Sequence, residues 1–264
     1  MSHRFLCQFA TTPVVRYVEV AQPIQPLAVQ GPIRMLAMIS SPSDFPPLDV
    51  EKEWHQLFEA LKPLEATGSL TVQRLATASL EELRHATMLG DFHVFHYIGH
   101  GGLNKQTGDG VLVLTGSDGR SQLATGHELF VMLANSPIQL AVLNSCLGAR
   151  ISAVDPYAGT AASLVHQGIP AVVAMQFEIS DHAAIAFSRT LYEAIAYGWP
   201  IDMAVGEARR AILATSKSEW ATPVLYLRAA NGVLVDVTKP TRLPAPPQPT
   251  GLVGSVADTV VSLH

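Results

Sequence analysis

Two short apolar segments constrain the fold of this chain more than any other feature of its sequence. Residues 91–102 (DFHVFHYIGHGG) and 139–146 (QLAVLNSC) each predict a buried strand that stops at a reactive side chain, His100 in the first and Cys146 in the second. In a parallel α/β sheet the carboxyl ends of neighbouring strands open into one crevice. We therefore expect the imidazole and the thiol to meet at one edge of such a sheet.

The rest of the chain alternates predicted strands with predicted helices. Three helices are expected to begin at the capping residues Asp49, Ser79 and Thr125. Further helices are expected at 157–166, 181–197 and 201–215, and further strands at 14–20, 33–39, 70–75, 111–114, 121–124, 171–175, 224–227 and 232–235. This alternation predicts an α/β fold of three layers, in which a mostly parallel sheet is flanked by helices.

Composition narrows the class of protein. The chain has 264 residues, of which 48% are hydrophobic and 15% charged, so it can bury a large core. A net charge of −5 without a basic cluster gives no reason to expect direct binding of nucleic acid. Only Cys7 and Cys146 are cysteines, which favours a reduced, cytoplasmic setting over a disulfide framework. No run approaches the ~20 apolar residues of a membrane span, so no membrane partner is expected.

The composition changes sharply at Lys239. Residues 239–250 (KPTRLPAPPQPT) contain five prolines and predict a semi-rigid linker, followed by a tail too short to form a domain. We expect one domain over 1–238 and a linker with its tail over 239–264. Such a linker is consistent with a chain cut from a longer protein and equally with one that ends in a docking tail.

Cys146 and His100 have the chemistry of a nucleophile and its base. A free thiol has a pKa of ~8.5 and needs a neighbouring imidazolium to become a thiolate at neutral pH. Gly101 and Gly102 allow a substrate backbone to approach His100 closely, and the backbone N–H groups of Gly101 and Cys146 can bind an oxyanion. The competing interpretation is a small buried cysteine and a hydrogen-bonded core histidine.

Other chemistries fit the sequence less well. His96 and His100 are four residues apart, but Tyr97 stands where a zinc-binding helix needs glutamate and no third ligand follows, so neither metal nor cofactor is expected. Ser152 occupies the arginine position of a C-x5-R phosphate loop, and no nucleophilic-serine elbow or P-loop is present. Glu178 and Asp181 follow the 171–175 strand and open toward the same crevice, where they can also serve as solvated helix-capping residues.

These residues resemble the CHAT family of caspase-like and separase-like cysteine peptidases of clan CD. The resemblance rests on FHVFHYIGHGG and LAVLNSCLGA, is supported by PPLDVEKEW and EWATPVLYLRAANG, and spans about 14–235. It implies a caspase-type fold, a His100–Cys146 dyad, and an oxyanion hole at Gly101 and Cys146. It also implies that Asn144 and the segment after Met175, which begins at Gln176, lie near the pocket for the residue that precedes the cut.

The resemblance further implies a cytosolic cysteine endopeptidase that acts on a protein substrate. Its expected regulator is a fused or separate sensor module in a bacterial signalling or defence system. Two alternatives stay open: a non-catalytic module of the same fold that signals by interaction or oligomerisation, and an acyltransferase with the same dyad. Asn144 is neutral where arginine- or lysine-specific clan members often carry an acid, so the sequence assigns no cleavage specificity.

Overall fold

The computed structural model describes residues 14–18, 24–104, 106–150, 158–177, 179–229 and 232–237, with the backbone alone described from Ser145 to Arg150. Its centre is a mostly parallel sheet in the order β1-β10-β9-β8-β5-β3-β4. The parallel strands are β3 (Ile33–Ile39), β4 (Leu70–Arg74), β5 (Val94–Leu103), β8 (Leu140–Arg150) and β9 (Ala171–Met175). At one edge β10 (Pro223–Leu227) runs antiparallel to β9, and β1 (Arg16–Tyr17) pairs with β10.

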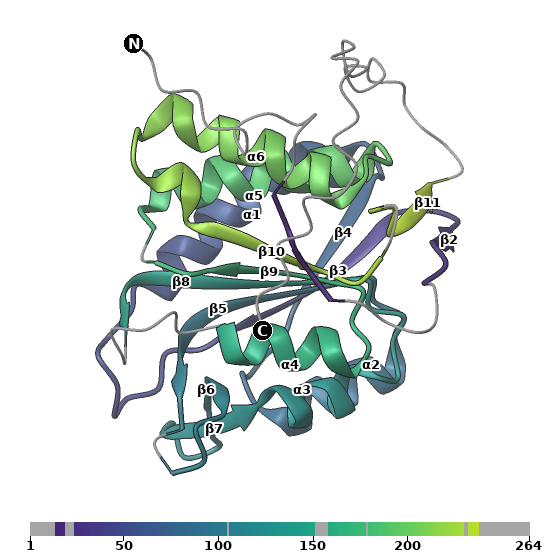
Figure 1. Cartoon of the computed structure of the whole chain (residues 1–264). Coiled ribbons are helices and arrows are strands. Elements are labelled where there is room, and N and C mark those ends of the chain that lie inside the picture. The colour runs from purple at the N-terminus through teal and green to yellow at the C-terminus, as the bar shows by residue number, and fades with distance from the viewer. Residues whose placement is uncertain are drawn as a thin grey trace.

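Helices cover both faces of this sheet (Figure 1). One layer contains α1 (Val50–Ala66), α5 (Asp181–Ala196) and α6 (Ile201–Thr215). The other layer contains α2 (Leu80–Leu89), α3 (Gly126–Leu133) and α4 (Ala158–Gln167). The structure thus confirms the predicted three-layer α/β fold, in which the sheet is buried from both sides.

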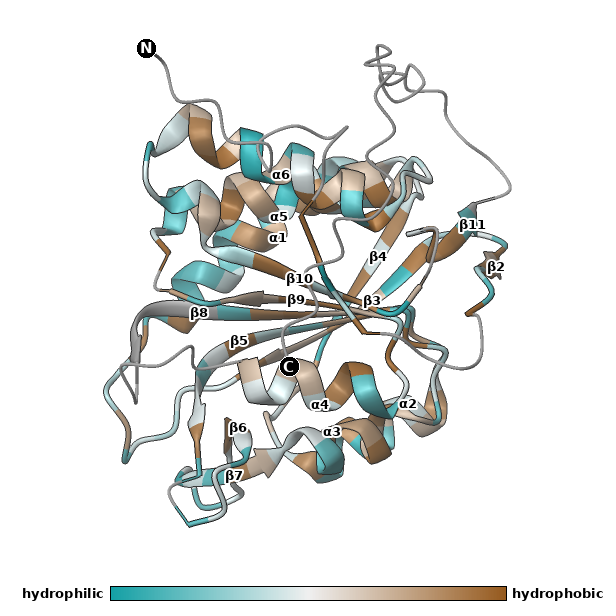
Figure 2. Ribbon diagram, viewed as in Figure 1, coloured by the Kyte–Doolittle hydropathy of each residue, from teal (hydrophilic) through white to brown (hydrophobic). Residues whose placement is uncertain are grey.

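The sequence explains why the sheet is covered on both faces. Along β5, Val94 and Ile98 pack in the core below α1 and α5, whereas Phe95 and Tyr97 pack in the core on the α3 and α4 side. Figure 2 shows apolar residues along the central strands and a mixture of apolar and polar residues along the helices on either side. Alternate side chains of one strand therefore supply two separate cores.

The predicted helix starts are confirmed at the capping residues. Asp49 Oδ1 accepts a hydrogen bond from the Lys52 backbone N–H at 3.3 Å, and Ser79 Oγ accepts one from the Glu82 N–H at 3.2 Å. Thr125 and Glu128 form a reciprocal capping box. Each cap satisfies a backbone donor that the first helical turn leaves unpaired.

Two strands continue beyond the residues at which the sequence predicts their ends. β5 runs past His100 to Leu103 because its last residues pair with the antiparallel hairpin of β6 (Gly110–Thr115) and β7 (Ser121–Thr125). β8 likewise runs past Cys146 to Arg150, which pairs with Gly101. Both extensions depend on partner strands, which the apolar pattern of a single segment does not reveal.

The chain ends differ in part from the prediction. The strand expected at 232–235 lies at Val235–Val237 (β11) and forms a separate two-stranded sheet with β2 (Leu27–Val29), for which the sequence predicted no strand. A short 3-10 helix, η2 (Glu219–Ala221), precedes β10. The expected linker and tail at 239–264, and Cys7, lie outside the described residues. No helix in the described part of the chain is long and apolar enough to cross a membrane.

Candidate active site

His100 is fully buried near the end of β5, and its ring is held by the loop between β3 and α1. His100 Nε2 lies 2.9 Å from the backbone oxygen of Pro46. A carbonyl can only accept a hydrogen bond, so this contact assigns a proton to Nε2. In the neutral imidazole Nδ1 then carries the basic lone pair, and it is the nitrogen suited to take a proton from a nucleophile.

The same loop also packs against the imidazole ring. The Phe45 ring lies 5.3 Å from the His100 ring, centroid to centroid, at an interplanar angle of 51°. Phe45 and Pro46 were not among the residues singled out from the sequence. The available signal was the PPLDVEKEW segment, because a proline fixes its own backbone φ and so helps to set where its carbonyl points.

The main chain of His100 is held by β6 and by a tyrosine from its own strand. His100 pairs with Val113 in the antiparallel ladder. The Tyr97 hydroxyl is 2.9 Å from the His100 carbonyl oxygen and 2.8 Å from that of Val113. Gly99 makes this possible, since a Cβ there would approach Tyr97 Cζ at 2.8 Å and the Ser40 carbonyl oxygen at 2.9 Å.

The backbone of β8 brings the Cys146 position beside His100. Ile98 pairs with Asn144 and Gly99 pairs with Ser145, so the next residue on each strand is His100 and Cys146. The register then shifts, and four residues of β8, 146–149, stand opposite His100 alone before Arg150 pairs with Gly101. The Cys146 side chain lies outside the described part, so its contact with His100 stays a prediction, as does the oxyanion hole at Gly101 and Cys146.

A narrow cavity lies between α1, α5 and the ends of β5 and β8. It leaves room for about one water molecule. Its lining includes Asn144 and Asp181, and their expected place near the substrate stays a prediction. The other lining residues are Glu53, Gln56, Leu57, Ile98, Ala184, Ile185 and Ser188.

The polar part of this cavity combines the carboxylates of Glu53 and Asp181 with the amides of Gln56 and Asn144 and the Ser188 hydroxyl. Asn144 is 5% exposed, and the buried Gln56 Oε1 makes no hydrogen bond to any residue that the structure describes. The Asp181 carboxylate pairs with Lys52 Nζ at 2.6 Å, where both side chains are partly solvated. The contact raises the pKa of the Lys52 ammonium group above its ordinary value, because the neighbouring carboxylate stabilises the cation.

Gln176 does not reach this cavity. Its side-chain Nε2 donates to the Ala221 carbonyl oxygen at 3.1 Å, and its backbone N–H donates to that of Thr222 at 3.0 Å. It lines a different cavity with Val14 and Trp220. Glu178 lies outside the described residues.

His96 is a core residue. It is fully buried on β5, and its Nδ1 is 2.6 Å from the Tyr192 hydroxyl on α5. Burial disfavours the charged ring and lowers the pKa of His96 to about 3. Within the described residues no three His, Cys, Asp or Glu side chains are grouped closely enough to hold a metal ion.

A mostly parallel sheet between two helical layers, with a buried histidine beside the cysteine position at adjacent strand ends, defines a three-layer α/β domain. The family model described as CHAT domain matches residues 8–242, and the chain belongs to the CHAT domain family. Membership makes it a cysteine peptidase-like domain. No curated protein matches the chain.

Two solved structures are similar in part. The Arg-specific cysteine proteinase gingipain R aligns with a TM-score of 0.47 and 11% identity, over 76% of this chain and 47% of its own. The complex of Porphyromonas gingivalis RgpB pro- and mature domains aligns with a TM-score of 0.46 and 13% identity, over 76% and 48%. The present chain therefore spans less than half the length of either structure.

Proposed function

We propose that this protein is a cysteine endopeptidase in which His100 and Cys146 form the catalytic dyad. The observation that carries the proposal is the register of β5 and β8, which puts the two residues next in line after the Gly99–Ser145 pair. The Pro46 contact adds to it, because it leaves the basic nitrogen of His100 to receive a proton.

The proposed reaction has two stages. The Cys146 thiol gives its proton to His100, and the resulting thiolate attacks the carbonyl carbon of the scissile peptide bond. The C–N bond then breaks as the imidazolium returns the proton to the leaving amine, which leaves a thioester on Cys146. Water, deprotonated by His100, attacks the thioester; the C–S bond then breaks, the acid leaves, and the imidazolium returns the proton to the Cys146 sulfur. The backbone N–H groups of Gly101 and Cys146 are the proposed donors to the oxyanion in both stages.

The cavity lined by Asn144 and Asp181 is the proposed pocket for the side chain that precedes the cut. Apolar walls from Leu57, Ile98 and Ile185 suit an aliphatic stem. Acceptor oxygens from Asn144, Gln56 and the acidic residues suit a head that donates hydrogen bonds. The described cavity has room for only about one water molecule, so its walls must move apart to admit lysine or arginine, the residues that this lining would suit. Gln176 and Glu178 are proposed contacts with more distant parts of the substrate.

The proposed setting is the cytoplasm of a bacterium, in a signalling or defence system. The substrate is a protein, and a fused or separate sensor module is the proposed activator, since an ungated endopeptidase would damage its host. Neither nucleic acid nor a membrane is a proposed partner of this domain. The proline-rich composition of 239–250 supports a connection to such a module.

A covalent-labelling experiment tests the proposal without knowledge of the activator. Peptidyl acyloxymethyl ketones with lysine, arginine, leucine or aspartate next to the reactive group are offered to the wild type and to Cys146→Ala, His100→Ala and Cys7→Ser. We expect labelling of Cys146 that is fastest with the basic probes, absent in Cys146→Ala and unchanged in Cys7→Ser. Labelling that proceeds at the same rate in His100→Ala would contradict the proposed dyad. Biological function that survives Cys146→Ala would favour the non-catalytic interaction module.

A further inference from the structure

We propose that Asp44 is a positioning residue of the candidate active site, because its carboxylate fastens the loop that orients the His100 ring to the β6–β7 hairpin. The inference rests on the proposed function, since it concerns how His100 acts on Cys146. It assigns a role to a residue that stands outside the proposed dyad, oxyanion hole and substrate pocket.

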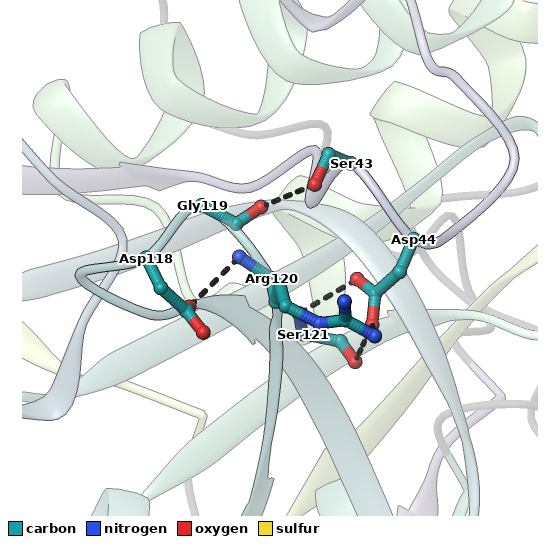
Figure 3. Close-up of polar contacts among 6 residues, drawn as sticks. All are labelled: Ser43, Asp44, Asp118, Gly119, Arg120 and Ser121. Atoms are coloured by element: carbon teal, nitrogen blue, oxygen red, sulfur yellow. Dashed lines mark hydrogen bonds and ion pairs between the residues drawn. The ribbon is translucent and has the colours of Figure 1, made fainter.

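The fastening consists of direct contacts between the loop and the hairpin (Figure 3). Asp44 Oδ1 accepts the Ser121 backbone N–H at 2.7 Å, and Asp44 Oδ2 accepts the Ser121 hydroxyl at 2.9 Å. The neighbouring Ser43 donates to the Gly119 carbonyl oxygen from its backbone N–H at 2.9 Å and from its hydroxyl at 3.0 Å. The Arg120 guanidinium lies 3.9 Å from the Asp44 carboxylate. Two consecutive loop residues are thus tied to one turn of the hairpin.

The path from Asp44 to the His100 ring is short. Phe45, the next residue, packs on the imidazole, and Pro46, the one after it, accepts the hydrogen bond from Nε2. The backbone N–H of Phe45 also donates to the Pro42 carbonyl oxygen at 3.2 Å, which closes the loop into a turn. A displacement of Asp44 therefore moves both groups that set the orientation of the ring.

The hairpin holds the main chain of His100 as well as its ring. Val113 on β6 pairs with His100, and the Ser40 hydroxyl at the end of β3 donates to the Val113 carbonyl oxygen at 2.7 Å. The backbone of His100 is thus fixed to β6 directly, and its ring is fixed to the β6–β7 turn through Asp44. Without the Asp44 contacts the ring would lose a support that its backbone retains.

Because Asp44 is exposed, its substitution should affect the orientation of the His100 ring more than the stability of the fold. Asp44 lies at the surface, and contacts between exposed polar groups contribute little to the free energy of unfolding. The reaction rate of Cys146 is far more sensitive to the position of His100, since a misplacement of a catalytic group by ~1 Å can lower a rate about 100-fold. We expect substitution of Asp44 to change the reactivity of Cys146 without a matching loss of melting temperature.

The test measures alkylation of Cys146 by iodoacetamide between pH 5 and 9, in a Cys7→Ser background. A thiol with a pKa of ~8.5 is roughly 0.3% ionised at pH 6, so fast reaction at that pH reports the imidazolium. The variants are Asp44→Ala, Asp44→Asn and His100→Ala. Asp118→Ala is the matched control, because Asp118 accepts from the Arg120 backbone N–H in the same turn at 3.0 Å and makes no hydrogen bond to any described residue of the β3–α1 loop.

We expect Asp44→Ala to lower the rate at pH 6 about 10-fold or more, toward that of His100→Ala, with an unchanged melting temperature. Asp44→Asn should recover part of the rate, since the amide oxygen can still accept the Ser121 N–H, and Asp118→Ala should react like the wild type. Wild-type rates in Asp44→Ala would overturn the inference alone. So would a rate loss that accompanies a lower melting temperature and is not recovered by Asp44→Asn. Equal rates in the wild type and His100→Ala would overturn the proposed dyad, and the inference with it.

Discussion

Replacement of Gly99 by alanine should disrupt the support of His100 through steric overlap. A Cβ at this position would lie 2.8 Å from Tyr97 Cζ, closer still to the Tyr97 hydroxyl oxygen, and 2.9 Å from the Ser40 carbonyl oxygen. The Ser40 carbonyl belongs to the backbone and cannot rotate away. The added methyl group must therefore displace the tyrosine, whose side chain is fully buried.

The expected cost combines overpacking with a lost hydrogen bond. Extra methyl groups in a well-packed core cost about 1–3 kcal/mol. Displacement of the Tyr97 hydroxyl from the His100 and Val113 carbonyl oxygens adds about 1 kcal/mol. We expect Gly99→Ala to lower the free energy of unfolding by about 2–4 kcal/mol. Gly99 does not have a positive φ, so no backbone strain enters this figure.

Urea unfolding of four proteins measures the effect: the wild type, Gly99→Ala, Tyr97→Phe and the double variant. Removal of the hydroxyl takes away the closest contact of the new methyl group. The double variant should therefore be more stable than the sum of the single effects predicts, by about 1 kcal/mol. Gly116→Ala is the control, because its Cβ would meet only Asp118 Oδ1 at 3.1 Å and the Arg120 carbonyl oxygen at 3.4 Å.

Two results would refute this reasoning. A loss of less than about 0.5 kcal/mol in Gly99→Ala would show that the site relaxes around the methyl group, since such a value is usual for harmless surface changes. Strict additivity of the two single variants would show that the tyrosine hydroxyl is not the group that the methyl displaces.

Three further predictions follow from the site and the composition. The double variant of Cys146→Ala and His100→Ala should cleave peptides hardly less well than either single variant, because residues that act as a unit are not additive; a much weaker double variant in the same assay would mean that they act independently. His96 should stay neutral from pH 7 to 5, because its folded pKa of about 3 lies below the ordinary 6.5. The unfolded chain takes up that proton first, so this contribution to stability is present above about pH 6.5 and is lost as the pH falls toward 3; NMR signals of the His96 ring that shift between pH 7 and 5 would contradict this. Truncation after Val237 should leave the melting temperature nearly unchanged, since a proline-rich segment offers few backbone donors and little apolar surface to a core; a large drop would mean that the tail docks on the domain.

The sequence by itself determined most of the layers, since the chemistry of strands and helix starts is local. Alternating apolar runs predicted β3, β4 and β9 to within a residue at either end. Asp49, Ser79 and Thr125 predicted three helix starts, because a cap requires only a side-chain acceptor two or three residues before a backbone donor. Apolar runs that end in His100 and Cys146 also indicated which strands carry the candidate site.

Only the tertiary structure decided what surrounds His100. The Pro46 carbonyl, the Asp44–Ser121 contact and the Val113 pair join residues that lie between 13 and 77 positions apart in the chain. The hydrophobic pattern of a segment indicates which of its faces is buried, but it does not indicate which distant segment packs against that face. Polar contacts between loops produce no periodic pattern in the sequence. For that reason the contacts of Asp44 with the β6–β7 hairpin and of Pro46 with His100 exist only in the tertiary structure.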